Sequence, residues 1–414
     1  MNDPLSLRMA AMRLQPRSAT RRATGLLLAG LLALMPPAWG QVWVPNESLV
    51  SSQKDLLDPE YNQARAQFTW SDADGKLWVG NIDRDTGMFY PPDGKAVLVD
   101  PDTMTADDVL KTLNGPEWVF STGGDGIAYT KFAGRRHTTA NARLGYARPL
   151  PDGNWSVGFL GPDVTRRAPY GSETAGDPKP RITYVDGDNN HYWREIDDPS
   201  TEELLPDTPS RVGPVRHVRG ARAVIYTTPV AGIPQVFYRD LDSGQVTQLT
   251  SDAGAKDQPY MWMAPEFGGE FVFMTMVENN QLRIYRNLPQ PGTGVMVWTP
   301  IYSAIAPRRD SFTSPEPFTF QGRSYVFMAM IVGNHGFSSE LWISNIDASN
   351  PLFRRISDNA VLRARTDPEV FATNHGVFIY YNRRLLDTSG RKPKACPGVP
   401  CSEGIYRADT GLGS

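Results

Sequence analysis

Short runs of β-branched and aromatic residues recur along the chain at intervals of roughly fifty residues. Runs of this composition, bounded by turn residues, are typical of β-strands. Seven of them can be picked out, and their starts lie 59, 55, 42, 47, 54 and 52 residues apart. The runs are Phe68–Trp70, Ile127–Thr130, Ile182–Val185, Val224–Thr227, Phe271–Met274, Tyr325–Met328 and Val377–Tyr380.

Each run is followed by a second apolar run, and most of these pairs are followed by a third. Turn residues such as Asp74-Gly75 and Asn279-Asn280 separate most pairs, which is typical of β-hairpins. After residue 40 the chain contains no long stretch with the 3.6-residue period of a helix, and the one helical-looking piece is Thr105 to Leu113. Each unit therefore predicts a short antiparallel sheet of up to four strands.

Sheets of this size cannot bury both faces alone, but radial stacking around an axis buries them and leaves only short edges. The repeat predicts an all-β fold, a seven-bladed β-propeller, with six or eight blades as alternatives. The last unit ends soon after Ile405-Tyr406 without a further strand, whereas the surplus apolar run Gln41 to Val44 precedes the first unit. We therefore expect an N-terminal strand to complete the last blade and close the ring.

The first forty residues have the pattern of a cleavable signal peptide. Five arginines precede an apolar run from Gly25 to Met35, and Ala38-Trp39-Gly40 offers a cleavage position. This run is too short to span a bilayer as a helix. We expect residues 1–40 to be removed, with no membrane span left, and residues 41–414 to fold as one propeller domain that is periplasmic or secreted. Arg21-Arg22 leaves both Sec and twin-arginine export open.

Removing this leader takes away five arginines and one acid, so the formal net charge changes from −3 to −7. Because a nucleic-acid binder usually presents a basic face, we expect no nucleic-acid partner. Cys396 and Cys401 are the only cysteines, and in an oxidising compartment we expect them to form a disulfide. The loop between them is short, so the bond should stiffen a surface hairpin. A metal-binding pair is the alternative, but no second cysteine or histidine cluster lies nearby, and we predict no metal ligands there.

One repeat unit resembles a known class. The segment Gln235 to Thr250 runs from an apolar strand through Asp242-Ser243-Gly244 to a strand that ends Leu249-Thr250. It is similar to the TolB-type, WD-like propeller repeat, and Leu341 to Asp358 is a looser match. The resemblance implies the propeller fold and an extracytoplasmic setting. The class includes binding proteins and peptidase companion domains, so it implies no particular chemistry.

A Pro-Glu pair opens five of the units, a few residues before the first strand run. This is where the innermost strand of each blade should lie, so the five carboxylates are candidates to converge near the propeller axis. The residues are Glu60, Glu117, Glu266, Glu316 and Glu369, each preceded by proline.

Three roles are open for these glutamates. Each could bond a neighbouring blade and serve only the repeat. Together they could form a ligand site or hold a cation such as Ca²⁺, because crowded carboxylates raise one another's pKa. Two of them could also act as acid and base, as in the five-bladed glycosidase families to which the pattern is similar. No spacing in the sequence shows which pair would do so.

Several common chemistries lack their signatures. The chain has no H-E-x-x-H, no G-x-S-x-G and no phosphate-binding loop, so we expect no cofactor other than the possible Ca²⁺. The function expected is that of an exported binding protein, a monomer, which presents a propeller face or an axial pocket to a protein or glycan partner. The alternative is a carbohydrate-active hydrolase or lyase with its carboxylates at the axis.

Overall fold

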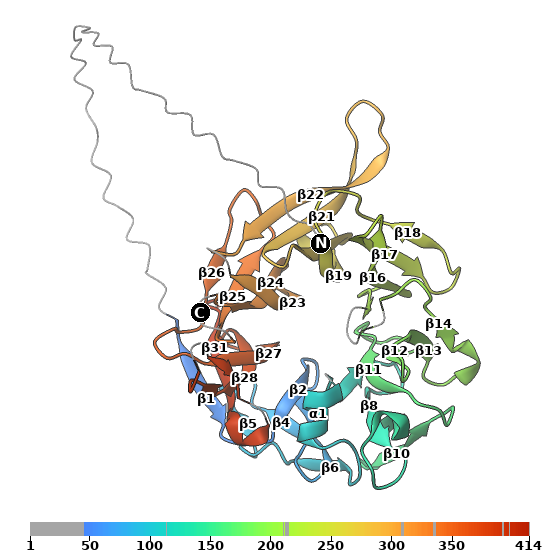
Figure 1. Ribbon diagram of the computed structural model, residues 1–414, viewed down its shortest axis with the longest axis vertical. Coiled ribbons are helices and arrows are strands. Elements are labelled where there is room, and N and C mark those ends of the chain that lie inside the picture. The colour runs from blue at the N-terminus through green and yellow to red at the C-terminus, as the bar shows by residue number, and fades with distance from the viewer. Residues whose placement is uncertain are drawn as a thin grey trace, which may run out of the picture. The chain divides into compact units, whose positions relative to one another are not determined.

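Seven antiparallel sheets stand around a central axis in the computed structural model (Figure 1). The structure describes residues 45–112, 114–209, 211, 215–307, 310–333, 337–390, 393–396 and 398–413. The signal peptide expected at residues 1–40 and the strand expected at Gln41 to Val44 lie outside them. The prediction of an all-β, seven-bladed propeller is confirmed. The single short α-helix, α1, spans Ala106–Thr112, inside the predicted segment.

Every blade is built outward from an innermost strand that faces the axis. The second and third strands contain the paired apolar runs found in the sequence. The innermost strands are β2 (Leu57–Asn62), β7 (Glu117–Val119), β11 (Arg167–Gly171), β15 (Arg216–His217), β19 (Lys256–Ala264), β23 (Ser311–Phe320) and β27 (Ala364–Ala372). The second strands are β3 (Gln67–Ser71), β8 (Gly126–Phe132), β12 (Arg181–Val185), β16 (Ala223–Val230), β20 (Glu270–Val277), β24 (Arg323–Ile331) and β28 (Val377–Arg384).

The outer half of each blade has the same regularity. The third strands are β4 (Leu77–Ile82), β9 (Ala142–Pro149), β13 (His191–Glu195), β17 (Ile233–Asp240), β21 (Gln281–Pro289), β25 (Ser339–Asn345) and β31 (Ser402–Asp409). The outermost strands are β5 (Phe89–Tyr90), β6 (Val97–Asp100), β10 (Trp155–Leu160), β14 (Glu203–Leu204), β18 (Val246–Gln248), β22 (Met296–Ile305), β26 (Phe353–Arg355) and β1 (Glu47–Ser51). Short 3₁₀ turns occur at Thr139–Asn141, Pro199–Thr201, Pro265–Phe267 and Val399–Cys401.

The last blade contains both ends of the propeller. Its strand order is β27-β28-β31-β1, so the N-terminal strand pairs antiparallel with the C-terminal one and closes the ring, as predicted. The closing strand is Glu47–Ser51 rather than the expected Gln41 to Val44. Its position is fixed by charge as well as by backbone pairing, because the Glu47 carboxylate accepts hydrogen bonds from Arg365 Nε (2.6 Å), Arg365 Nη2 (3.1 Å) and the Tyr381 hydroxyl (2.6 Å).

The hydrophobic core is divided among the contacts between blades. Seven clusters of buried side chains each join one blade to the next, so the ring has as many apolar contacts as it has blades. The cluster between the last blade and the first contains Val50 of β1 together with Trp70, Phe371 and Tyr380. The closing strand therefore adds apolar contact to the ring as well as hydrogen bonds. A small eighth cluster, including Val109, packs α1 against the second blade.

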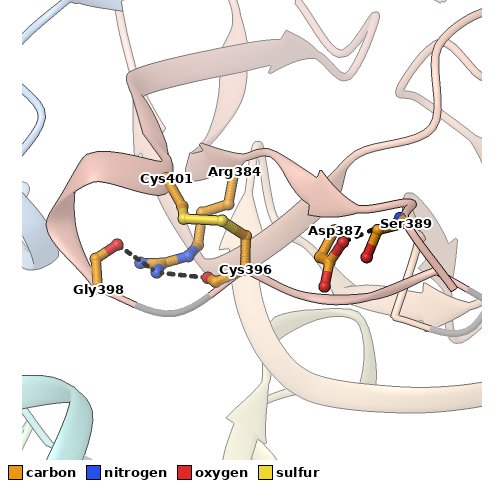
Figure 2. The surroundings of a disulfide bond; sticks show 6 residues. All are labelled: Arg384, Asp387, Ser389, Cys396, Gly398 and Cys401. Atoms are coloured by element: carbon orange, nitrogen blue, oxygen red, sulfur yellow. Dashed lines mark hydrogen bonds between the residues drawn. A yellow bond between two sulfur atoms is a disulfide. The ribbon is translucent and has the colours of Figure 1, made fainter.

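A disulfide joins Cys396 and Cys401, as the sequence predicts, within an insertion between β28 and β31 (Figure 2). The insertion includes a small hairpin, β29 (Leu386–Asp387) with β30 (Lys394–Ala395). Figure 2 shows the Arg384 guanidinium beneath the bond, where its Nη2 donates to the carbonyl groups of Cys396 (3.3 Å) and Gly398 (2.9 Å). Cys401 is buried, so the loop is attached to the blade on one side.

Candidate functional site: an axial ring of seven side chains

The innermost strands share a local sequence that the Pro-Glu pairs only partly reveal. Five of them contain a residue followed by proline and then by glutamate or tyrosine, and a sixth, β7, begins at the last residue of such a motif. In five of the six, the residue before proline has φ between 47° and 50°, and the pairing register with the second strand shifts there. The motifs are Asp58-Pro59-Glu60, Gly115-Pro116-Glu117, Ala168-Pro169-Tyr170, Gln258-Pro259-Tyr260, Ser314-Pro315-Glu316 and Asp367-Pro368-Glu369.

These register shifts are β-bulges with a physical cause. Proline has no backbone N–H for the ladder and keeps the preceding residue out of the right-handed helical region. A bulge places one extra residue in the strand and changes the direction of the side chains that follow. Positive φ in a residue with a side chain is unfavourable by about 1–3 kcal/mol and persists only where the surrounding structure enforces it. The repeated bulge therefore belongs to the architecture of the axis.

One side chain from each innermost strand lines a pocket of about 760 Å³ on the axis. Their order around the ring is symmetrical about blade four. Arg216 stands between two tyrosines, each tyrosine has a glutamate as its next neighbour, and the last two glutamates are adjacent on the opposite side. In chain order the seven are Glu60, Glu117, Tyr170, Arg216, Tyr260, Glu316 and Glu369.

Four of the five glutamates singled out in the sequence lie in this ring, and Glu266 does not. Glu266 belongs to the 3₁₀ turn Pro265–Phe267, which follows the innermost strand of its blade instead of forming part of it. Its Oε1 accepts the backbone N–H of Ser324 at 2.9 Å, and its Oε2 accepts the Ser324 hydroxyl at 2.8 Å. The expectation of an axial position is wrong for Glu266, because its carboxylate is used to join blade five to blade six.

Arg216 is the cationic member of the ring. Its guanidinium carbon lies 4.3 Å from the ring centroid of Tyr170 and 5.2 Å from that of Tyr260. The Tyr260 hydroxyl in turn donates to Glu316 Oε1 at 2.7 Å. Within the described part of the chain, no carboxylate oxygen lies within ion-pairing distance of Arg216. The guanidinium is thus held between aromatic rings without a direct ion pair, and its charge acts through space on Glu117 and Glu316, where it opposes the rise of their pKa values.

The glutamates opposite Arg216 are also left without partners. Among the described residues, the carboxyl groups of Glu60 and Glu369 make no hydrogen bond. Burial, followed by repulsion from Glu117 and Glu369, raises the pKa of Glu60 well above its usual value. Burial, with repulsion from Glu316 and Glu117, does the same to the pKa of Glu369. Both groups keep their protons at a higher pH than an ordinary glutamate does.

The pKa values of Glu117, Glu316 and Asp58 in the pocket are raised as well. Burial raises the pKa of Glu117 strongly, although Arg216 and a hydrogen bond from Asn114 oppose it. Burial also raises the pKa of Glu316 against the effect of Arg216. At one end of the pocket, burial and the nearby Asp367 raise the pKa of Asp58 to about 7. Asp58 Oδ2 accepts the backbone N–H of Gly115 at 2.6 Å, which limits the rise.

His217 also lines the pocket and is only 6% exposed. Neither ring nitrogen has a hydrogen bond of ordinary geometry, although the Tyr170 backbone is close enough to oppose part of the pKa change. Burial, together with the charge of Arg181, lowers the pKa of His217 to about 3. The imidazole is therefore neutral and offers one donor and one acceptor.

The pocket opens where the innermost strands end. All seven blades are built in the same order from axis to rim, so these strands run in the same direction along the axis. The exposed lining residues Gln63, Ala64 and Glu173 follow the ends of β2 and β11. Near this mouth, Arg219 pairs with Glu173 and donates from Nη1 to the Pro317 carbonyl at 2.7 Å. At the other end, α1 contributes Val109 to the lining.

Sequence reasoning missed the non-acidic half of the ring. Tyr170 and Tyr260 occupy the place of glutamate after the bulge proline, so a search for proline followed by any polar side chain would have found them. Arg216 could not be found in this way, because Pro214 precedes it by two positions instead of one. Asp58 and Asp367 stand directly before their prolines, and that signal was available.

Two further findings concern the described residues alone. No three Asp, Glu, His or Cys side chains among them lie close enough together to hold a metal ion. In the same part of the chain, no helix is long and apolar enough to cross a membrane.

Comparisons with known proteins support the fold and no particular family. No protein-family model matches the chain, and no curated protein matches it. TolB from Acinetobacter baumannii is 15% identical over 84% of this chain and 79% of its own, with a TM-score of 0.38. An ancestral GH74 enzyme is 13% identical over 86% of this chain and 48% of its own, with a TM-score of 0.48. A sialidase from Trypanosoma rangeli is 9% identical over 89% of this chain and 60% of its own, with a TM-score of 0.39.

The class of protein that the fold defines is the seven-bladed β-propeller, and this one is distantly similar in structure to TolB and to other propellers. The resemblance seen in Gln235 to Thr250 implied that architecture correctly. The chain spans about half the length of the GH74 enzyme. At these sequence identities the similarities concern the fold alone, and the axial ring is the feature of this protein that bears on its ligand-binding chemistry.

Proposed function

We propose that this protein is an exported binding protein whose axial pocket takes the end of a glycan. The observation that carries the proposal is the axial ring, in which Glu60 and Glu369 offer carboxyl groups that the fold itself does not use. The pocket volume of about 760 Å³ lies within the range of roughly 300–1,000 Å³ typical of small-ligand sites.

The chemistry of the lining favours a ligand rich in hydroxyl groups. A protonated carboxyl group donates one hydrogen bond and accepts others, as a hydroxyl group requires of its partner. The raised pKa values of Glu60 and Glu369 support this state. Trp118 and Phe318 add aromatic walls, against which the C–H face of a sugar ring can pack. A rigid ring of strands holds all of these groups in place before the ligand arrives.

A glycan-array screen with the full chain tests the proposal, followed by titration calorimetry on each hit. Glu369→Ala should weaken binding by at least about tenfold, the loss expected for one hydrogen bond of about 1.4 kcal/mol. Glu369→Gln should retain most of the affinity, because an amide also donates and accepts. The matched control is Glu270→Ala, which removes an exposed carboxylate of blade five that pairs with Arg286 and is not among the lining residues. Binding that survives Glu369→Ala unchanged contradicts an axial site.

A carbohydrate-active hydrolase is the second candidate, and Asp58 favours it. A carboxylic acid with a pKa of about 7 is suited to general acid catalysis near neutral pH, and other carboxyl groups share its pocket. Hydrolysis of a bound glycan by the wild type, abolished by Asp58→Asn with binding intact, would establish the enzyme. Glycans recovered whole after long incubation would leave the protein a binder.

A further inference from the structure

Of the two arginines that line the axial pocket, Arg219 makes an ion pair and Arg216 makes none with a described carboxylate, and this difference distinguishes among glycans. We infer that the glycan end taken by this pocket carries a carboxylate, which Arg216 binds, while the carboxyl groups of Glu60 and Glu369 hydrogen-bond the hydroxyl groups on the opposite side. The ligand class is thus an acidic sugar. This inference rests on the proposed glycan-binding function and adds the chemistry of the ligand.

The first argument is that the Arg216 guanidinium is available to bind a ligand, whereas Arg219 and Arg384 are occupied by protein groups. Arg219 pairs with Glu173 and donates to a backbone carbonyl. Arg384 donates to the two carbonyl groups of the disulfide loop. Arg216 alone lines the pocket without an ion pair in the part of the chain that the structure describes. An arginine fork binds carboxylate through two parallel hydrogen bonds, and aromatic rings on both sides keep it in one orientation.

The second argument is the distribution of groups around the ring. The order arginine, tyrosines, glutamates gives the pocket a cationic side and a carboxyl side, separated by aromatic rings. A neutral sugar would use the carboxyl side and leave the charge of Arg216 unmatched. A sugar with a carboxylate uses both sides at once.

The acids do not repel such a ligand while they hold their protons. Burial and mutual repulsion favour the uncharged form of Glu60, Glu117 and Glu369. Binding should therefore weaken as the pH rises through these elevated pKa values, because each ionisation adds a negative charge beside the ligand. The titratable groups that act on Arg216 from the surrounding strands are Tyr170, Tyr260, Glu117, Glu316 and Asp58.

The experiment compares methyl glucoside with two sugars that each differ from it at one position, C6 in the glucuronide and C2 in the glucosaminide. Methyl glucuronide carries a carboxylate, methyl glucoside a hydroxyl and methyl glucosaminide an amine, and each is titrated into the full chain at pH 5 and pH 8. The glucuronide should bind at least about tenfold more tightly than the glucoside at pH 5, which is the lower end expected for a hydrogen bond between charged groups. That preference should shrink at pH 8.

Variants of Arg216 decide the cause of the preference. Arg216→Gln should bring the glucuronide down to the affinity of the glucoside, and Arg216→Lys should keep part of the preference. Arg286→Gln is the control, since it removes an arginine from an exposed ion pair with Glu270. Melting curves establish that each variant is folded, and Arg216→Lys carries the test if Arg216→Gln does not fold.

The outcomes separate this inference from the proposed function. If glucoside and glucuronide bind equally, the inference is overturned while the axial glycan site stands. If the glucosaminide binds most tightly, the inference is overturned, because the pocket then prefers a cationic ligand that the carboxyl groups of Glu60 and Glu369 bind. If none of the three binds the folded protein, both the inference and the proposed function fail.

Discussion

Glu47 and Glu369 belong to the same blade, yet their carboxyl groups are in opposite situations. Glu47 lies at the closing seam, its side chain 4% exposed, and Arg365 and Tyr381 satisfy both oxygens. Glu369 lies on β27, four residues after Arg365, with no hydrogen bond among the described residues. One carboxylate stabilises the fold by being charged, and the other is held where charge is unfavourable.

The Pro-Glu pairs of blades five and six show the same contrast between a glutamate that joins blades and a glutamate that faces the pocket. Glu266 is fully used by Ser324 of the next blade, whereas Glu316 faces the pocket beside Tyr260. The same dipeptide therefore serves the joints between blades in one case and the axis in the other. Glutamates at the joints should therefore stabilise the folded protein. Glutamates at the axis should lower its free energy of unfolding, a cost expected of residues that serve ligand binding.

The largest expected effect is at the seam. Glu47→Ala removes the nearer of two carboxylates from the Arg365 guanidinium, which is 2% exposed and keeps only Asp358 Oδ1 at 3.7 Å. Loss of one partner of a buried ion pair typically costs about 3–5 kcal/mol. Urea unfolding at pH 7 measures this change. The exposed pair of Glu270 and Arg286 is the control, and Glu270→Ala should cost less than about 1 kcal/mol. Equal losses in the two variants would contradict the distinction between seam and surface.

The disulfide comes next. Cys396→Ser with Cys401→Ser should lower the free energy of unfolding by at most about 2–3 kcal/mol, because the bond closes a short loop. Burial raises the pKa of Asp367 in the pocket lining, and the charge of Arg384, which the loop carbonyl groups hold, opposes part of that rise. Opening the loop should therefore raise that pKa further, which carboxyl NMR titration can follow. An unchanged titration of Asp367 would show that the loop acts on stability alone.

At the joint between blades five and six, Glu266→Gln should destabilise by about 1–3 kcal/mol. The amide cannot accept from both groups of Ser324, so a backbone donor or a hydroxyl loses its partner. The loss should be nearly the same at pH 5 and pH 8, as measured by thermal melts. A gain in stability on this substitution would contradict a role for Glu266 in joining the blades, because a gain is expected only for the axial glutamates.

The smallest effect should have the opposite sign. Glu60 and Glu369 have raised pKa values in the folded protein, so their contribution to stability is complete below the unfolded value of 4.5 and is lost as the pH rises through the folded value. Glutamine cannot ionise. Glu60→Gln and Glu369→Gln should therefore stabilise the protein at pH 8 by on the order of 1 kcal/mol each, with little effect at pH 4. Destabilisation at pH 8 would show that the carboxylates are paired.

The strands were predictable because they carry the core. Runs such as Val224–Thr227 and Tyr325–Met328 are apolar since they pack between blades, and the seven clusters of buried residues repeat at the period seen in the sequence. Five of the seven innermost strands are interrupted by a proline, and the other two, β7 and β15, have only three and two residues, so strand propensity does not mark them. Only the dipeptide repeated beside them indicated where they lie.

The candidate site was half predictable for a related reason. Glu60, Glu117, Glu316 and Glu369 repeat a pattern, whereas Arg216 departs from it by one residue in its distance from proline. Glu266 matches the pattern but lies in a turn, because the nine-residue strand β19 ends before it. A local dipeptide contains no information about the Ser324 that meets Glu266 from the next blade. Such long-range contacts decide which repeated residues face the axis.

The pairing of β1 with β31 also sets an order of events. Glu47 and Arg365 are 318 residues apart in the chain and meet only in the last blade. The strand that is synthesised first is therefore the last to find its place. Until β31 is available, β1 has no edge to join, and the six blades between them form an open arc with two uncovered faces. A polypeptide arranged in this way becomes a ring only when its final strand has arrived.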